Sequence, residues 1–389
     1  MTPARVLLAL SGLALLASCS GMIPAPRGPA GPPGTALGEG VAKGPPISGL
    51  AIAGPDAAAA LASFRESCPR LVTRTDASGL TRGADWKPAC DAARTWPAAD
   101  APGFFRQWFE TARIGAGKAF ATGYYEPEIA GSRRRVTGHD VPVYGLPPDL
   151  VRARPGDAPP LDDGRQPLGR YENGRFVPYH DRAAIERGAL TGRGLEIAWA
   201  ADPVELFFMQ VQGSGRLRAP DGTVMRLGYA GQNGHSYTGL GTIMRQRGLI
   251  GSGPGQFSGS MQGIMEWLRS HPDEGREIMR QNRSFVFFRE TVGDGPVGAL
   301  NVPVRAHSSV AADPKFVPLG APVWLTVDRA EASGLWIAQD TGGAIKGANR
   351  FDTFWGAGPS ARQIAGGMTA RGAALLLLPK GTLDRLGAR

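Results

Sequence analysis

The chain has 389 residues, of which 42% are hydrophobic and 20% are charged. This length and composition support a globular protein of up to two domains with a sizeable core, and they exclude a chain that is disordered throughout. The formal net charge is +9, but the sequence has no basic helical stripe and no aromatic-basic recognition motif, so we expect no nucleic-acid partner. An acidic surface or polymer, such as an anionic cell-wall glycan or lipid head groups, suits a secreted basic protein better.

The chain begins with a basic end followed by a short apolar run, Val6–Leu16. This run is shorter than the roughly 20 residues that span a membrane and is typical of an export signal. It is followed by a Leu-Ala-Ser-Cys box ending at Cys19, which resembles the cleavage site of bacterial lipoproteins. We therefore expect a lipoprotein signal peptide at residues 1–18 and a lipid-modified Cys19, with an ordinary secretory peptide as the alternative. Ser20, directly after the cysteine, favours sorting to the outer membrane.

The next segment, residues 19–55, is rich in glycine, alanine and proline and has few bulky apolar residues. Such a segment cannot bury enough surface to become ordered, so we expect a tether between the lipid and the folded part. Only Cys68 and Cys90 remain beyond it. Export to an oxidising compartment makes a disulfide between them the expectation, with two free buried thiols as the alternative.

Beyond the tether, the apolar spacing predicts helices over 57–64 and 104–111, and a strand over 119–127 that ends at a proline. The following portion is predicted to be an all-β module, because its short segments are rich in β-branched and aromatic residues and are separated by glycine and proline. Its expected strands cover 141–144, 175–179, 196–199 and 204–212, with short helices at 181–187 and 242–246.

A pair of helices follows this module. Ser260 is placed to cap a helix over 261–268, and Pro272 opens a second helix over 273–280. The β pattern then resumes, with expected strands at 284–289, 323–327 and 372–379.

Several kinds of catalytic site are excluded by their missing motifs. No histidine stands in a metal-ligand spacing with a cysteine or another histidine, so no metal site and no cofactor is expected. The serine-hydrolase pattern G-x-S-x-G is absent, and the glycine-rich segment 251–255 lacks the Lys-Ser/Thr of a phosphate loop. Carboxylates remain as the candidates for acid-base chemistry.

Three aspartates follow one another in the C-terminal part of the chain: Asp313, Asp340 and Asp352. Asp352 lies between Phe351 and Phe354, an apolar setting that raises the pKa of a carboxyl group and keeps it protonated as an acid. The alternative is an exposed strand aspartate beside buried aromatic rings. Asp340 precedes a Thr-Gly-Gly turn and Asp313 precedes a proline, so both also have an architectural interpretation.

Two cations accompany these aspartates. Lys346 and Arg350 are either solvated charges, or they hold carboxylates of a substrate, or they lower the pKa of Asp340.

The order of these motifs resembles a known family. Four upstream segments are similar to the membrane-bound lytic murein transglycosylase A family, and the C-terminal segments are similar to its three-aspartate domain. The upstream segments are TGYYEP at 122–127, QVQGSG at 210–215, GYAGQNG at 228–234 and NRSFVFF at 282–288. The C-terminal ones are AADP at 311–314, PLG at 318–320, DTGGAIKG at 340–347 and RFD at 350–352.

The resemblance implies a mainly-β fold with a few short helices. A double-psi β-barrel would be built from residues 56–127 plus 291–389, at both ends of the folded chain. A second β domain, residues 128–290, would be inserted into it, and a groove between the two would hold a glycan strand.

The resemblance also implies a reaction. The family cleaves the β-1,4 bond between N-acetylmuramic acid and N-acetylglucosamine in peptidoglycan and leaves a 1,6-anhydro end. Asp352 matches the family's single catalytic aspartate: it would protonate the glycosidic oxygen and then, as a carboxylate, take the proton of the muramyl C6 hydroxyl that attacks the anomeric carbon. Asp340 would position Asp352 or the sugar.

Other residues of the matching motifs are candidates for the glycan groove, because sugar sites place polar groups among apolar ones. Tyr124 would stack on a sugar face, and the polar side chains would hydrogen-bond N-acetyl and hydroxyl groups. The candidate groove residues are Tyr124, Gln212, Gly213, Ser214, Gln232, Asn233 and Lys346. Each has a structural alternative, such as a core position for Tyr124 or a turn position for Gly213 and Ser214.

Two other functions stay open at this point. One is a protein that binds the wall on the same barrel without cutting it, and the other is a hydrolase that uses Asp352 and Asp340 together. In either case the expected location is the periplasmic face of the outer membrane, with a lipid anchor. The expected state is a monomer, and membership of a cell-wall synthesis or hydrolysis complex is left open.

Overall fold

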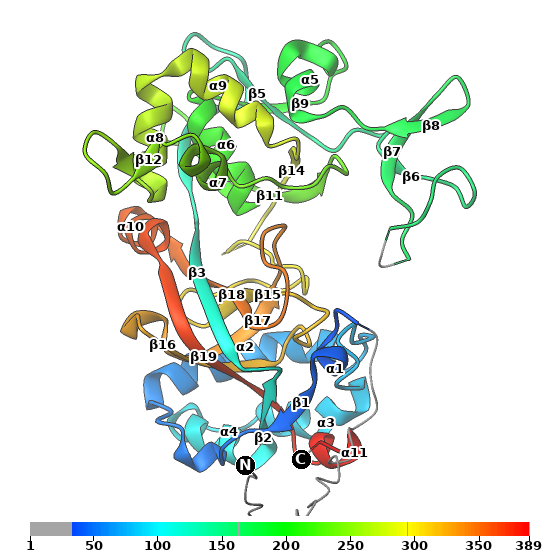
Figure 1. Ribbon diagram of the computed structural model, residues 1–389, viewed down its shortest axis with the longest axis vertical. Helices are drawn as coiled ribbons and strands as arrows, with labels where there is room; N and C mark the ends of the chain where they lie inside the picture. Colours follow the sequence, from blue (N-terminus) through cyan, green and yellow to red (C-terminus); the bar gives the residue numbers. More distant parts are fainter. Residues whose placement is uncertain (1–32, 162–163, 294, 389) are drawn as a thin grey trace, which may run out of the picture.

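The computed structural model describes residues 33–161, 164–293 and 295–388. It has two lobes, with both ends of the described chain in one lobe and the middle of the chain in the other (Figure 1). The predicted signal peptide, Cys19 and the first part of the predicted tether lie outside the described residues. In the described ranges, no helix has the length and apolar character needed to cross a membrane.

The first lobe is built on a closed barrel of six strands. The strands are β3 (Lys118–Glu126), β15 (Ser309–Ala312), β16 (Pro322–Val327), β17 (Gly334–Asp340), β18 (Arg350–Ala357) and β19 (Thr369–Pro379). They pair in the order β19-β16-β17-β15-β18-β3, and a further pairing of β3 with β19 closes the ring. The pairs β15–β17 and β18–β3 are parallel and the others are antiparallel. The predicted mainly-β fold, with a barrel drawn from both ends of the folded chain, is therefore confirmed.

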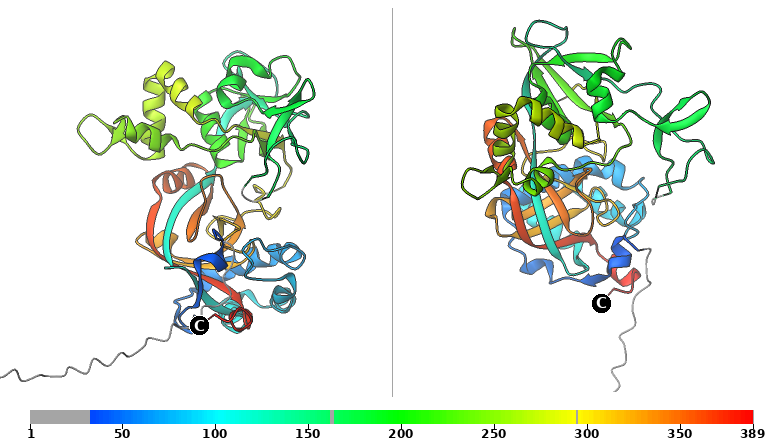
Figure 2. Two further views of the ribbon diagram at one scale, coloured as in Figure 1. Left: turned by 45° about the vertical axis from the view of Figure 1, so that its right-hand side comes forward. Right: turned by 45° about the horizontal axis from the view of Figure 1, so that its top comes forward.

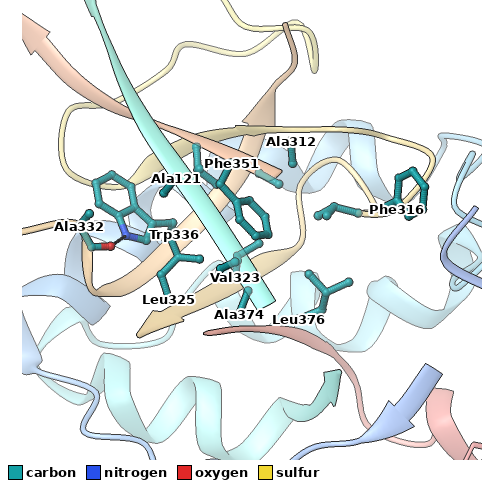
Figure 3. Close-up of a cluster of buried hydrophobic side chains, with 14 of the residues drawn as sticks. Ala121, Ala312, Phe316, Val323, Leu325, Ala332, Trp336, Phe351, Ala374 and Leu376 are labelled. Atoms are coloured by element: carbon teal, nitrogen blue, oxygen red, sulfur yellow. Dashed lines mark hydrogen bonds between the residues drawn. The ribbon is translucent and has the colours of Figure 1, made fainter. Parts of the chain in front are cut away.

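The inside of the barrel is filled by large apolar side chains (Figure 3). Phe351, Val323, Leu325 and Trp336 are all buried there, and the indole of Trp336 donates a hydrogen bond of 3.0 Å to the carbonyl of Ala332. Burial of each such side chain stabilises the fold by roughly 1.5–3 kcal/mol. This core makes the barrel a rigid base for the residues that point outward from the same strands.

Helices cover one side of the barrel. They are α2 (Gly54–Leu71), α3 (Gly83–Ala93) and α4 (Ala101–Trp108). Their shared core contains Phe64, Phe104 and Phe109, whose rings lie 5.5–5.8 Å apart. Cys68 of α2 and Cys90 of α3 form a disulfide, with their Cα atoms 5.5 Å apart.

The helix predicted over 104–111 is wrong in its second part. Helix α4 ends at Trp108, and strand β2 (Phe109–Ile114) begins at the next residue. The aromatic ring of Phe109 packs with the helices while its backbone pairs with β19. Apolar spacing therefore continued across the change from helix to strand.

The predicted tether is wrong for residues 33–55. They form helix α1 (Ala36–Glu39), strand β1 (Val41–Lys43) and a 3-10 turn at Ile47–Gly49. Strand β1 pairs antiparallel with β2, and Ile52 is buried against the helical core. The segment is ordered because the barrel lobe supplies hydrogen-bond partners and an apolar surface, which its own composition does not reveal.

The second lobe contains a six-stranded sheet in the order β14-β11-β10-β4-β9-β5. Its strands are β4 (Glu128–Ser132), β5 (Val141–Tyr144), β9 (Glu196–Ala200), β10 (Gly215–Arg218), β11 (Val224–Gln232) and β14 (Val286–Glu290). A three-stranded arm of β6 (Val151–Arg152), β7 (Leu168–Glu172) and β8 (Arg175–Pro178) projects from this lobe (Figure 1). The short pair β12 (Ile250–Gly251) and β13 (Phe257–Ser258) completes its strands.

The second lobe also contains the helices α5 (Arg182–Ala184), α6 (Pro203–Gln212), α7 (Leu240–Gln246), α8 (Met261–Ser270) and α9 (Pro272–Gln281). Of these, α6 packs against the sheet. The short helices predicted over 181–187 and 242–246 are confirmed, and the all-β interpretation of the middle portion is wrong only where it places a strand instead of α6. The predicted caps of the helical pair are confirmed: the Ser260 hydroxyl accepts from the Gly263 N–H, and Pro272 opens α9. Segment 204–212, predicted as a strand, is helix α6.

Helix α6 was mistaken for a strand because it is buried on nearly all sides. Six of its ten residues are buried, so no polar face marks the helical period. The signals that could have identified it stand at its ends. The carboxylate of Asp202 caps the helix, Pro203 is its first residue, and Gly213 ends it in the left-handed conformation with a φ of 80°.

The two lobes are joined through strand β3, which rises out of the barrel toward the second lobe (Figures 1 and 2). The side-chain oxygen of Gln212, at the end of α6, accepts the backbone N–H of Tyr125 at 3.0 Å. Near the other end of α6, Glu205 accepts from Arg362 of α10 (Pro359–Gly367) at 3.1 Å. Helix α6 therefore contacts the barrel lobe at both of its ends.

Candidate active site

Two of the three aspartates lie on either side of strand β15. Ala311 of β15 is opposite Asp352 of β18 in one pairing and opposite Asp340 of β17 in the other. Since neighbouring strands lie about 4.8 Å apart, the two aspartate Cα atoms are about 10 Å apart. Residues directly opposite each other share one face of a sheet, so both carboxylates project from the same face.

That face is the outside of the barrel. Phe351, next to Asp352, fills the barrel core, and Asp352 itself points the other way because side chains alternate along a strand. On the outer face Asp352 is opposite Thr122, and Phe354 is opposite Tyr124. The apolar setting expected around Asp352 thus exists, but of its two flanking rings only Phe354 shares its face.

The carboxylate of Asp352 is held by a short chain of hydrogen bonds. The hydroxyl of Thr122 donates to Oδ1 of Asp352 at 2.5 Å, and the guanidinium of Arg350 donates to the same hydroxyl at 2.9 Å. Asp352 is only partly accessible. Burial raises its pKa to about 6, although the Thr122 hydrogen bond and the Arg350 charge act in the opposite direction.

Asp340 has a different set of partners. Its Oδ1 accepts the backbone N–H groups of Ala299 and Thr341, both at 2.9 Å, and its Oδ2 accepts the Tyr124 hydroxyl at 3.2 Å. Burial raises the pKa of Asp340 to about 6, against these three hydrogen bonds. The negative charge of Asp340 in turn raises the pKa of Asp352.

Asp313, the third aspartate, is architectural. It is buried, and its two oxygens accept the backbone N–H groups of Lys315 at 3.1 Å and Gly347 at 2.9 Å. It thereby fixes the loop between β17 and β18 to the turn after β15. Lys346, in that loop, is exposed and makes no hydrogen bond or ion pair within the described ranges.

Comparisons with known proteins agree with this geometry. Residues 120–289 match the model of the MltA specific insert domain, and residues 308–378 match the model of the 3D domain. The crystal structure of MltA from Neisseria gonorrhoeae superposes with a TM-score of 0.73 and 36% identity, over 92% of this chain and 98% of that one. The chain belongs to the membrane-bound lytic murein transglycosylase A family.

Two curated relatives match only part of the chain. Membrane-bound lytic murein transglycosylase A of Vibrio cholerae is 31% identical over 64% of this chain and 62% of its own length. The Escherichia coli protein of the same name is 33% identical over 63% of this chain and 61% of its own length. The chain thus spans about three fifths of these curated relatives. The crystal structure of E. coli MltA with bound chitohexaose has a TM-score of 0.62 and 27% identity.

Within this family site, Tyr124 is placed differently from the prediction. Its ring is 8% exposed and packs on the ring of Phe354, with centroids 4.9 Å apart, so the ring face is not open to a sugar. Its hydroxyl holds Asp340 instead. Burial, followed by the charges of Asp340 and Asp352, raises its pKa well above the ordinary value, so it remains a donor.

The predicted groove residues of the second lobe are largely engaged in structure. Asn233 is fully buried: its amide donates to the carbonyls of His180 and Arg283, and its oxygen accepts the Phe285 N–H. Asn233 therefore has no surface for a ligand, and its predicted contact with the glycan is wrong. The side chain of Gln232 is partly exposed and accepts the N–H of Gly234 at 2.7 Å.

The Gln212-Gly213-Ser214 segment lies where the two lobes meet. Gln212 holds β3 through Tyr125, and Gly213 is the left-handed cap of α6. Ser214 is partly exposed and has no hydrogen-bond partner in the part of the chain that the structure describes. A Cβ placed on Gly215 would lie 2.5 Å from the sulfur of Met209, so a larger residue there would displace that buried side chain.

Three residues at the site were not identified, or not correctly assigned, from the sequence. Thr122 lies in the TGYYEP motif, but only its pairing with Asp352 reveals its contact. The sequence leaves three alternatives for Arg350: a solvated charge, a contact with a substrate carboxylate, or an effect on Asp340. In the structure it donates to the Thr122 hydroxyl, and its charge lowers the pKa of Asp352. Tyr237 of the second lobe lies beside Gly343, in the loop that follows Asp340, and is outside the matching motifs. Within the described ranges, no cluster of three or more His, Cys, Asp or Glu side chains is placed to hold a metal ion.

Proposed function

We propose that this protein is a lytic transglycosylase that cleaves the β-1,4 bond between N-acetylmuramic acid and N-acetylglucosamine and leaves a 1,6-anhydro-N-acetylmuramic acid end. The observation that carries the proposal is Asp352: a carboxyl group with a pKa of about 6, held on the outer face of the barrel by Thr122. Family membership and the chitohexaose complex of the E. coli relative support a β-1,4-linked glycan as the substrate.

The partners of the two aspartates support a division of roles. Asp340 accepts two backbone N–H groups and a tyrosine hydroxyl, all of which stabilise a carboxylate. Asp352 accepts a single hydrogen bond from a side chain. When the pair holds one proton, Asp352 carries it and acts as the acid, while Asp340 remains ionised and keeps the pKa of Asp352 high.

The reaction then needs one residue in two successive states. Neutral Asp352 gives its proton to the glycosidic oxygen as the bond to the anomeric carbon breaks. The resulting carboxylate takes the proton of the muramyl C6 hydroxyl while that oxygen attacks the anomeric carbon. Because the nucleophile belongs to the same sugar, the ring closes without a water molecule and the residue returns to its protonated state.

The location of the enzyme is part of the proposal. We infer that Cys19 carries a lipid that anchors the chain to the outer membrane on its periplasmic side, where murein is accessible. The lipoprotein box and the membrane-bound relatives support this inference. We expect a radioactive fatty acid to label the full-length chain and not the Cys19→Ala variant. Label that remains in the variant would contradict the anchor.

The experiment that tests the activity is mass spectrometry of muropeptides released from purified murein by a fragment beginning at residue 33. Products one water lighter than reducing sugars are expected from the wild type, and Asp352→Asn should release at least about 1,000-fold less, since general acid-base catalysis contributes up to about 10⁴-fold. Asp221→Asn, in an exposed hairpin turn, is the matched control and should stay fully active. Reducing ends would indicate a hydrolase, and binding without products would indicate a wall-binding protein.

A further inference from the structure

One tyrosine of the second lobe reaches the loop that follows Asp340. Tyr237 lies between β11 and α7, and its Cβ would be 3.4 Å from a Cβ placed on Gly343. Gly343 belongs to the β17–β18 loop, which Asp313 and Asp340 both hold. Tyr237 is therefore a contact between the two lobes at the site itself.

The backbone around Tyr237 is fixed on both sides. A ring nitrogen of His235 is 2.7 Å from the carbonyl oxygen of Tyr179, and the N–H of Thr238 donates to the side chain of Asn282 at 3.1 Å. Ahead of them, buried Asn233 anchors the start of the loop with three hydrogen bonds. These contacts hold the tyrosine in place before any substrate arrives.

The hydroxyl of Tyr237 makes no hydrogen bond to Asp352, but the two groups interact electrostatically. Burial raises the pKa of Tyr237, the charge of Arg182 acts in the opposite direction, and the charge of Asp352 raises it further. Among the residues that the structure describes, the hydroxyl has no hydrogen-bond partner. Its oxygen is not fully buried. A donor with no protein partner thus lies within electrostatic range of the catalytic acid.

We propose that Tyr237 contacts the sugar bound opposite Asp352 and donates a hydrogen bond from its hydroxyl to an oxygen of that sugar. The inference rests on the proposed lytic activity and adds a specific residue of the second lobe to it. Asp352 would approach the glycosidic bond from the barrel, and Tyr237 would hold the same sugar from the other lobe.

The chemistry of the sugar fits this role. Hydroxyl and N-acetyl oxygens of an amino sugar accept a phenol donor, and the ring of Tyr237 offers an apolar surface beside it. A sugar held from both sides keeps its C6 hydroxyl close to the anomeric carbon, which an internal attack requires. Losing this contact should therefore lower kcat in addition to weakening binding.

The test is Tyr237→Phe, which removes only the oxygen. We expect kcat/KM on purified murein to fall about 10-fold, as the loss of one hydrogen bond worth about 1.4 kcal/mol predicts, with part of the fall in kcat. The unfolding temperature should not change, because the hydroxyl has no protein partner. Tyr171→Phe is the matched control: it removes a hydroxyl that bonds Asp157 in the projecting arm, and it should keep full activity.

A second measurement separates this inference from the proposed function. In Asp352→Asn, which can bind without cutting, the added change Tyr237→Phe should weaken the binding of purified glycan strands severalfold. If the wild type forms anhydro products and Tyr237→Phe matches it in both kcat/KM and binding, the inference about Tyr237 is overturned and the activity stands. A drop of several degrees in unfolding temperature would assign the hydroxyl a structural role and would also overturn it. A wild type that forms no anhydro products would overturn the proposed function itself.

Discussion

The barrel and the inserted lobe use their most recognisable sequence motifs in different ways. In the barrel, the motifs containing Asp340 and Asp352 place both carboxylates on the outer face, with partners that tune their acidity. In the inserted lobe, Asn233 is buried within its motif and joins neighbouring segments of that lobe. Recognisable motifs therefore mark chemistry in one lobe and scaffold in the other, and the tyrosine that reaches the site from the inserted lobe lies just beyond its motif.

The largest effect within the barrel, after loss of the proposed acid Asp352, is expected for Asp340→Asn. The asparagine oxygen can still accept the N–H groups of Ala299 and Thr341, so the variant removes the charge and, at Oδ2, the acceptor of the Tyr124 hydroxyl. We expect kcat to fall about 100-fold, within the range of acid-base contributions. Because the charge of Asp340 raises the pKa of Asp352, its loss should move the alkaline limb of the rate profile to lower pH.

The measurement is the pH dependence of kcat/KM for the release of anhydro muropeptides between pH 4 and 8. Asp328→Asn, at a strand end on the barrel, serves as the control for a lost aspartate charge. An unchanged alkaline limb in Asp340→Asn would contradict the assignment of Asp340 as a residue that keeps the pKa of Asp352 high.

A smaller loss of kcat, with a shift of the alkaline limb in the opposite direction, is expected for Thr122→Val. The valine keeps the shape of threonine and removes the hydroxyl that donates to Asp352 and accepts from Arg350. This hydrogen bond lowers the pKa of Asp352, so its loss should raise that pKa and move the alkaline limb to higher pH. Poorer orientation of the carboxyl group should reduce kcat about 10-fold, as expected for one strong hydrogen bond.

Thr122→Ser retains the hydroxyl and should restore both the rate and the pH profile. If serine and valine behave alike, Thr122 acts only through packing. If the limbs of Thr122→Val and Asp340→Asn move in the same direction, the electrostatic description of the site is wrong.

Substitution of Asn233 in the inserted lobe should lower the free energy of unfolding and leave catalysis nearly unchanged. Asn233→Ala removes three buried hydrogen bonds and leaves their partners unsatisfied, which should cost about 2–4 kcal/mol of the free energy of unfolding. Gln232→Ala, which loses one turn hydrogen bond, is the comparison and should cost less. Thermal unfolding measures both, and the folded fraction of Asn233→Ala should keep near-normal kcat/KM at a low temperature. A kcat/KM reduced 100-fold with unchanged stability would show that Asn233 contacts the glycan after all.

The sequence predicts those features of the fold that depend on local signals. Strands with clear limits, such as the one ending at Pro127, and the capped helices after Ser260 and Pro272 were correctly predicted because their signals are local. Helix α6 and the ordered segment 33–55 were not, because burial on nearly all sides and strand pairing depend on distant parts of the chain.

The same limit applies to the candidate site. Asp352 and Asp340 were identified from their motifs, but the partners of Asp352 were not. Thr122 lies on another strand, more than 200 residues earlier in the chain, and only the parallel pairing of β18 with β3 brings it within hydrogen-bond distance. Tyr237 comes from the other lobe. Local patterns therefore identify the proposed acid, whereas the groups that tune its pKa depend on the fold.

The smallest expected effect is a gain in stability for Asp352→Asn that depends on pH. The pKa of Asp352 is about 6 in the folded protein and near 3.8 ordinarily, so the folded state retains a proton that the unfolded state loses between these values. Wild-type stability should therefore fall as the pH rises from about 4 to 6, by about 1–3 kcal/mol for a shift of this size. Asparagine does not titrate, so the variant should unfold at a similar temperature to the wild type at pH 4 and at a higher temperature above pH 6.

Asp221→Asn gives the comparison with an exposed carboxylate of the inserted lobe. Hydrogen bonds from Thr223 lower the pKa of Asp221, so its stabilising contribution is present at neutral pH and is lost toward acid. At pH 7 Asp221→Asn should be less stable than the wild type, whereas Asp352→Asn should be more stable. Thermal unfolding of both variants from pH 4 to 8 tests this comparison. A stability difference between Asp352→Asn and the wild type that does not change with pH would mean that burial does not raise the pKa of Asp352. The basis for its role as a neutral acid would then fail.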